Sequence, residues 1–204
     1  MNDFYLVLIV GFIASYIGSI PPGSLNLTII QLGAQGQRSA AWNFALASAL
    51  VEFIYAGIAV LAQQYLMANA SLSRHFELVT AIALLIIGGI NLIVRTKSSS
   101  TKSSISGENG FWRGFILSCV NPMAMPYWLV VTAGLQSAGW IGISSNNLVF
   151  YLIGISLGTW LLLWHASLFG AKLRVLQTKP LLMYRLPGLI LLSLSMYTFY
   201  NWSA

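Results

Sequence analysis

The sequence predicts an all-α integral membrane protein with six transmembrane helices, and three observations support this fold class. Hydrophobic residues make up 57% of the 204 residues and charged residues only 7%, whereas a soluble domain carries about 25% charged residues. The apolar residues form six long runs, without the period-2 alternation of membrane β-barrel strands. Prolines interrupt two of these runs in corresponding positions. A chain of this composition cannot cover itself with a soluble surface.

The six runs set the expected transmembrane spans. Each is close to or longer than the ~20 residues that an α-helix needs to cross a bilayer core. The polar stretches between them are too short for a soluble domain, and the N-terminus lacks the basic region of a cleaved signal peptide. We therefore expect residues 1–204 to form one transmembrane domain, with its first run retained as an anchor. The spans are expected at residues 4–33, 40–62, 76–94, 112–135, 147–170 and 182–202.

A polar connection divides the chain into two halves of three spans. Residues 96–110 are rich in serine and lightly charged, which is typical of a linker. The first half then covers about residues 1–95 and the second about 111–204. With an odd number of spans in each half, the second half inserts upside down relative to the first. The sequence thus predicts two inverted three-helix repeats, an arrangement common in secondary transporters.

Basic residues give the expected orientation. Only Arg74 lies on one side of the predicted topology, and the other nine Lys and Arg residues lie on the opposite side. The positive-inside rule places loops one, three and five in the cytoplasm and both termini outside. It also explains the net charge of +6 without a nucleic-acid partner. The nine residues are Arg38, Arg95, Lys97, Lys102, Arg113, Lys172, Arg174, Lys179 and Arg185.

The two proline breaks, Pro21–Gly23 and Asn121–Pro122, lie a hundred residues apart. Proline in a membrane helix frees backbone groups that lipid cannot satisfy, so these groups must face protein or a water-filled cavity. Pro22 lies eleven residues before Gly33, and Pro122 lies nine residues after Arg113. At about 1.5 Å per residue, each break is expected about 15 Å deep, near the midplane of a ~30 Å core. Broken helices in matching positions of two halves indicate a transporter binding site.

The breaks also provide candidate ligands for a small substrate. A helix that resumes after a break presents N–H groups with a partial positive charge, which suit a carboxylate. Asn121 is a candidate N-cap of the second resumed helix. The alternative interpretation is a pair of structural kinks that neighbouring helices heal. The candidate substrate-binding residues at the breaks are Pro22, Gly23, Ser24, Asn26, Asn121 and Pro122.

An acidic residue, Glu52, stands near the centre of the second span, where an ionisable group costs about 3 kcal/mol. Small residues at helical spacing form a face on which another helix can pack closely, so Glu52 is expected to point into the bundle. It could accept a substrate ammonium group or carry a proton, with Ser48 and Tyr55 in support. The alternative is a hydrogen bond to a neighbouring helix. The small residues are Ala41, Ala45, Ser48, Ala49, Ala56 and Ala59.

Other reactive residues give no further site. Cys119 is the only cysteine, so a disulfide or paired-thiol redox site is excluded, and we expect it to be buried. His165 has no second histidine or carboxylate at ligand spacing and is expected to be structural, while His75 is expected in an outer loop. The chain has no metal cluster, phosphate loop or nucleophile motif. We therefore expect no metal, no cofactor and no enzymatic activity.

The segment Gly18–Asn26, followed by Gly33, Gly36, Arg38 and Ala41, resembles the opening signature of the LysE-type translocators, which are small bacterial exporters of amino acids. The segment Gly114–Pro122 resembles the second signature of the family. The resemblance covers essentially the whole chain. It implies an inner-membrane protein that exports amino acids or similar small zwitterions.

Two residues depart from the family pattern. Ser24 stands where the family usually has the second proline of Pro-Gly-Pro, and Met123 stands where it has a lysine after Asn-Pro. If that lysine binds substrate or couples protons in relatives, this protein uses another substrate or another coupling mode.

The leading hypothesis is a proton-driven exporter whose partners are a small-molecule substrate, protons and the lipid bilayer. A metal-ion or cation transporter is the first alternative, but such sites need several carboxylates, histidines or thiolates, and only Glu52 lies deep in a predicted span. A thiol–disulfide transporter is excluded because Cys119 is alone. A non-transporting scaffold would leave the proline pair and Glu52 without a purpose. The small-residue face of the second span would serve a homodimer as well as an internal contact.

Overall fold

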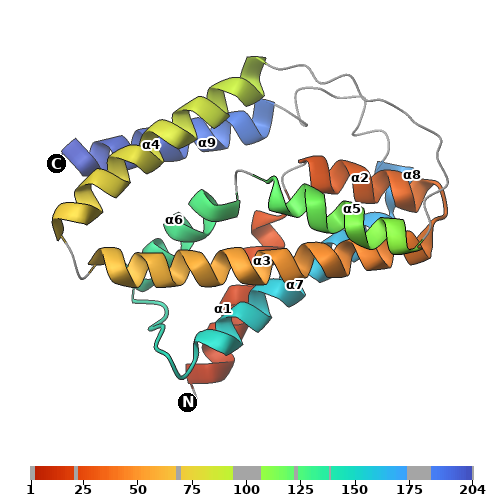
Figure 1. Ribbon diagram of the computed structural model, residues 1–204, viewed down its shortest axis with the longest axis horizontal. Helices are drawn as coiled ribbons and strands as arrows, with labels where there is room; N and C mark the ends of the chain where they lie inside the picture. Colours follow the sequence, from red (N-terminus) through yellow and green to blue (C-terminus); the bar gives the residue numbers. More distant parts are fainter. Residues whose placement is uncertain are drawn as a thin grey trace.

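The computed structural model describes residues 3–20, 23–67, 70–93, 107–121, 124–137, 139–173 and 185–203. Within these ranges the regular structure is helical and contains no strand, as the composition predicts. The helices are α1 (Asp3–Gly18), α2 (Ser24–Ala34), α3 (Arg38–Met67), α4 (Ala70–Ile93), α5 (Gly107–Cys119), α6 (Ala124–Ser137), α7 (Leu148–Leu168), α8 (Gly170–Leu173) and α9 (Leu186–Ser203) (Figure 1).

Among the described residues, two helical segments are long and apolar enough to cross a membrane. They are Arg38–Tyr65 within α3, and α7. The pair α5 and α6 would form a third span, bent by 65°. Helices occupy all six predicted ranges, but the six membrane crossings and the inverted repeat stay predictions. His75 lies inside α4 and not in a loop, because this helix begins earlier than the apolar run predicts.

Both predicted breaks are present. The first apolar run forms α1 and α2, which are separated by a gap between Gly18 and Ser24, and the fourth forms α5 and α6, which are separated by a gap between Cys119 and Ala124. Pro21, Pro22 and Pro122 themselves lie outside the described residues. The helices end just before these prolines because a proline lacks the N–H group that would continue the helix.

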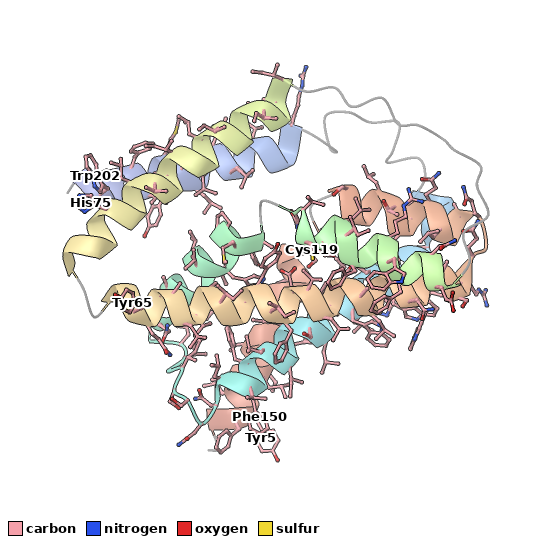
Figure 2. All side chains as sticks on the ribbon, in the orientation of Figure 1. Tyr5, Tyr65, His75, Cys119, Phe150 and Trp202 are labelled. Carbon is pink, nitrogen blue, oxygen red and sulfur yellow. The ribbon has the colours of Figure 1, made fainter. Side chains whose placement is uncertain are left out.

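The α1 helix, which precedes the first break, packs closely on α7, a helix of the second half of the chain. A Cβ atom on Gly158 would lie 3.0 Å from the backbone nitrogen of Tyr16, so glycine is needed for α7 to approach α1. Ser15 and Thr159 join the two helices through hydroxyl groups 2.7 Å apart. The helices run parallel, and Tyr5 and Phe150 lie together at their N-terminal ends (Figure 2).

The α5 helix, which precedes the second break, packs on α3 in the same way. A Cβ on Gly110 would meet the backbone of Ala40, and one on Gly114 would meet the backbone of Phe44. Both pairs differ by seventy residues (110 − 40 and 114 − 44), so α5 and α3 run parallel with a fixed offset. All six small residues of the α3 face are buried within the single chain, so this face makes an internal contact.

Two further helix pairs, α3–α7 and α4–α9, are antiparallel. Ser156 on α7 donates a hydrogen bond to the carbonyl of Ala49 on α3 (3.0 Å), and a Cβ on Gly57 of α3 would meet Leu152, earlier on α7. On α9, Ser195 donates to the carbonyl of Ala81 on α4 (2.8 Å). The α4–α9 pair lies along one side of the molecule (Figure 1). His75 and Trp202 lie together at one end of this pair (Figure 2).

Candidate substrate site at the helix breaks

Glu52 points at the second broken helix. Its Oε1 atom accepts a hydrogen bond from the indole Nε1 of Trp128. Trp128 lies about one turn into α6 and is only 1% exposed, while Glu52 keeps part of its surface accessible. The carboxylate therefore faces the bundle, as its small-residue face predicts. The same contact also fits the alternative interpretation, in which Glu52 only forms a hydrogen bond to a neighbouring helix.

Aromatic rings surround this contact. Trp128 meets Tyr127 and Tyr151 edge-on, with ring centroids 5.0 and 6.5 Å apart respectively. The Tyr151 hydroxyl lies 3.2 Å from the Thr132 hydroxyl. The carboxylate therefore has an N–H donor and aromatic rings around it, and no basic side chain among the described residues forms an ion pair with it. Such a site leaves the negative charge of Glu52 available to a ligand or a proton.

Tyr55 contacts the second break. Its hydroxyl donates a hydrogen bond of 2.5 Å to the carbonyl oxygen of Cys119, the last residue of α5. Carbonyl groups in the last turn of a helix lack the N–H partners of a further turn, and lipid cannot supply a donor, so the Tyr55 hydroxyl provides one at this helix end. The supporting role of Tyr55 toward Glu52 stays a prediction. Cys119 is exposed, which corrects its expected burial; Figure 2 shows it at the end of α5.

Tyr127 joins the flanks of the two breaks. Its hydroxyl donates to the carbonyl of Ala14 in the last part of α1 (2.8 Å). A Cβ on Gly18, the final residue of α1, would collide with the Tyr127 ring. The beginning of α6 therefore packs against the end of α1, and the broken stretches converge. Tyr127 and Trp128 are not among the residues predicted from the sequence, although two aromatic residues five and six positions after Pro122 were a usable signal.

The first break is partly closed by its own side chains. The Asn26 side-chain amide donates to the carbonyl of Ser19 (2.7 Å), and Thr28 donates to the carbonyl of Ser24 (2.9 Å). Asn26 thus supports the interpretation of a healed kink. Gly23 forms the N-cap of α2 without a side-chain cap, and nothing lies within 4 Å of the position of its missing Cβ. Gly23 and Ser24 are exposed, so this helix end remains open.

The last two predicted residues to consider are Asn121 and Ser48. The Asn121 backbone N–H donates to the carbonyl of Ser118 (3.1 Å). Residues 122 and 123, which join Asn121 to α6, lie outside the described residues, so its role as the N-cap of α6 stays a prediction. Ser48 is 1% exposed, and its hydroxyl has no hydrogen-bond partner. It is buried one turn from Glu52 and does not contact its carboxylate through a hydrogen bond.

These features define a helical membrane protein in which two broken helices converge beside an acidic residue, Glu52, that faces the helix bundle. A family model described as LysE type translocator matches residues 16–201, a range that includes both breaks and Glu52. The chain belongs to the LysE type translocator family, and is therefore a membrane transporter. No curated protein and no solved structure was found to match it.

Proposed function

We propose that this protein is a secondary active exporter of amino acids or similar small zwitterions, driven by the proton gradient across the bacterial inner membrane. The observation that carries the proposal is the contact of Glu52 with Trp128, which sets the acidic residue near the centre of the second predicted span against a broken helix. Membership of a translocator family supports transport. The substrate and the coupling ion are inferred from the chemistry of the site.

In this proposal the two ends of a zwitterion bind to different elements. The substrate carboxylate binds the open N-terminus of α2 at Gly23 and Ser24, and the start of α6 near Asn121 and Pro122. A helix N-terminus is suited to an anion because its first N–H groups are unpaired and carry partial positive charge. The substrate ammonium, or a proton, binds Glu52 in place of the Trp128 indole. Asn26 and Tyr55 hold the broken helices in shape, and Ser48 lies beside the site.

The packing pattern supports the proposed inverted repeat. In an inverted repeat, α1, α3 and α4 of the first half correspond to α5, α7 and α9 of the second. Under this correspondence the parallel contact of α1 with α7 becomes the parallel contact of α5 with α3. The correspondence leaves the antiparallel pairs α3–α7 and α4–α9 unchanged. In these four pairs, two odd-numbered or two even-numbered predicted spans run parallel, and an odd-numbered span runs antiparallel to an even-numbered one. Six crossings in alternating directions require this pattern. Rocking of one half against the other would expose the site alternately to the two sides.

The test is efflux from proteoliposomes loaded with individual amino acids. We expect Glu52→Gln to lower proton-driven efflux by about tenfold or more, because a neutral amide neither carries a proton nor pairs with an ammonium group. Glu108→Gln is the matched control, since Glu108 is exposed in the first turn of α5. Unchanged rate and pH dependence in Glu52→Gln would contradict the role of this residue. Failure of the wild-type protein to move any amino acid would contradict the substrate class.

A further inference from the structure

His165 and Tyr16 form a polar pair next to the first break, and the proposed function does not use it. The Tyr16 hydroxyl and His165 Nδ1 lie 3.2 Å apart, and the two rings meet edge-on with centroids 6.2 Å apart. Tyr16 lies in the last turn of α1, and His165 lies in the last turn of α7. Both are partly buried. The sequence predicts a structural role for His165, but its hydrogen bond is to another ionisable side chain.

Among the described residues of the four helices that pack on α7, none places an acidic side chain at the end that holds His165. Of the elements that pack on α7, α1 presents Tyr16 at this end and α2 has no ionisable residue. At this end α3 has Arg38, and α8 has Lys172, both exposed. Near this end, Trp42 of α3 meets Trp164 of α7 edge-on (4.9 Å between centroids).

Glu52 lies too far away to pair with His165. The Ser156–Ala49 hydrogen bond fixes the antiparallel register of α7 and α3, and in that register Glu52 stands opposite residue 153 (156 + 49 − 52). His165 lies twelve residues further along α7 (165 − 153), which corresponds to about 18 Å at 1.5 Å per residue. The two ionisable groups therefore form separate sites, one associated with each break.

We propose that the His165–Tyr16 pair is a second proton-binding site of the transporter, located at the first break. This proposal rests on the proposed function. Histidine is the side chain that ordinarily gains and loses a proton near neutral pH. A tyrosine hydroxyl can donate to a neutral imidazole nitrogen and accept from a protonated one, so the pair keeps its hydrogen bond in both states. A proton that binds Nδ1 only reverses the direction of this bond.

The ends of two helices favour a positive charge at this position. Both α1 and α7 end close to His165, and the carbonyl ends of helices carry a partial negative charge. Protonation therefore places the new charge where backbone dipoles can interact with it. An ionisable residue in a membrane segment is usually functional, and here it contacts the helix that leads directly into a break. Proton uptake at His165 would thus accompany movement of the α1–α2 break.

Proton-driven efflux measured from about pH 5.5 to pH 8, the range in which histidine titrates, tests the proposal. We expect His165→Gln to abolish the pH dependence in this range and Tyr16→Phe to move its midpoint by about half a pH unit or more. The chain has two histidines, so His75→Gln is the matched control, and Tyr197→Phe, at an exposed tyrosine of α9, controls for loss of a hydroxyl. A pH profile of His165→Gln identical to that of His75→Gln would overturn the proposal.

A spectroscopic measurement separates this proposal from the proposed function. The two histidine ring signals of the protein in lipid nanodiscs can be followed by NMR across the same pH range, with His75→Gln to assign them. We expect the His165 signal to titrate and its midpoint to move in Tyr16→Phe. This readout needs neither transport nor a folded His165 variant. A His165 signal that does not change with pH overturns the proton site, whereas a titrating His165 in a protein that moves no amino acid overturns only the substrate class.

Discussion

A carboxylate in an apolar interior needs hydrogen-bond donors, because desolvation penalises its charge. Trp128 supplies one such donor to Glu52. We predict that Trp128→Phe lowers the free energy of unfolding by about 1–3 kcal/mol, the cost of a buried group left without its partner. Chemical unfolding in detergent measures this loss. Trp140→Phe is the control, since Trp140 is 68% exposed, and equal stabilities of the two variants would contradict the importance of the Trp128 contact.

A second residue-scale prediction uses Cys119 as a reporter of the second break. Tyr55→Phe removes the hydroxyl that donates to the Cys119 carbonyl, so the end of α5 loses a tether. We expect the thiol, the only one in the chain, to react several-fold faster with a maleimide. Tyr197→Phe should leave the labelling rate unchanged, because Tyr197 is exposed on α9. A labelling rate of Tyr55→Phe that matches the wild type would show that this hydrogen bond does not hold the break.

The breaks could be predicted from the sequence, but the side chains that complete the site could not. Proline acts on its own helix, so Pro22 and Pro122 fix where α1 and α5 must end. The partner of Glu52 depends on how two helices pack, and Trp128 lies 76 residues away. The same limit applies to Tyr55: helical spacing brings it near Glu52, but it does not show that Tyr55 reaches across to Cys119.

At the scale of helices, glycines determine how closely the broken runs can pack. A Cβ on Gly114 would lie 2.9 Å from the Cα of Phe44, while nothing lies within 4 Å of the corresponding position at Gly134. We predict that Gly114→Ala destabilises the protein by about 1–3 kcal/mol, because α5 must move away from α3. Gly134→Ala should be neutral or stabilising by up to about 1 kcal/mol, since alanine favours helix. Thermal unfolding of the two variants in detergent distinguishes these effects, and a similar change in both would contradict the close α3–α5 contact.

For the whole molecule, the pairing of helices across the two halves explains how two distant breaks meet. The α1 helix packs on α7, and α5 packs on α3, so neither half encloses its own break. Tyr127 then carries the contact from α6 to the end of α1. The sequence predicts two halves from the count of apolar runs, but this exchange of partners depends on tertiary packing. A site formed in this way would change shape whenever one half moves against the other.

The predicted membrane topology can be tested at two exposed residues. Gln35 lies between α2 and α3, and Ser145 lies between α6 and α7, with both exposed. Three predicted spans separate them, so the topology places Gln35 in the cytoplasm and Ser145 outside. In a Cys119→Ser background, an impermeant maleimide added to intact cells should label Ser145→Cys and leave Gln35→Cys unlabelled until the cells are opened. Labelling of Gln35→Cys alone would reverse the orientation, and labelling of both from outside would contradict three crossings between them.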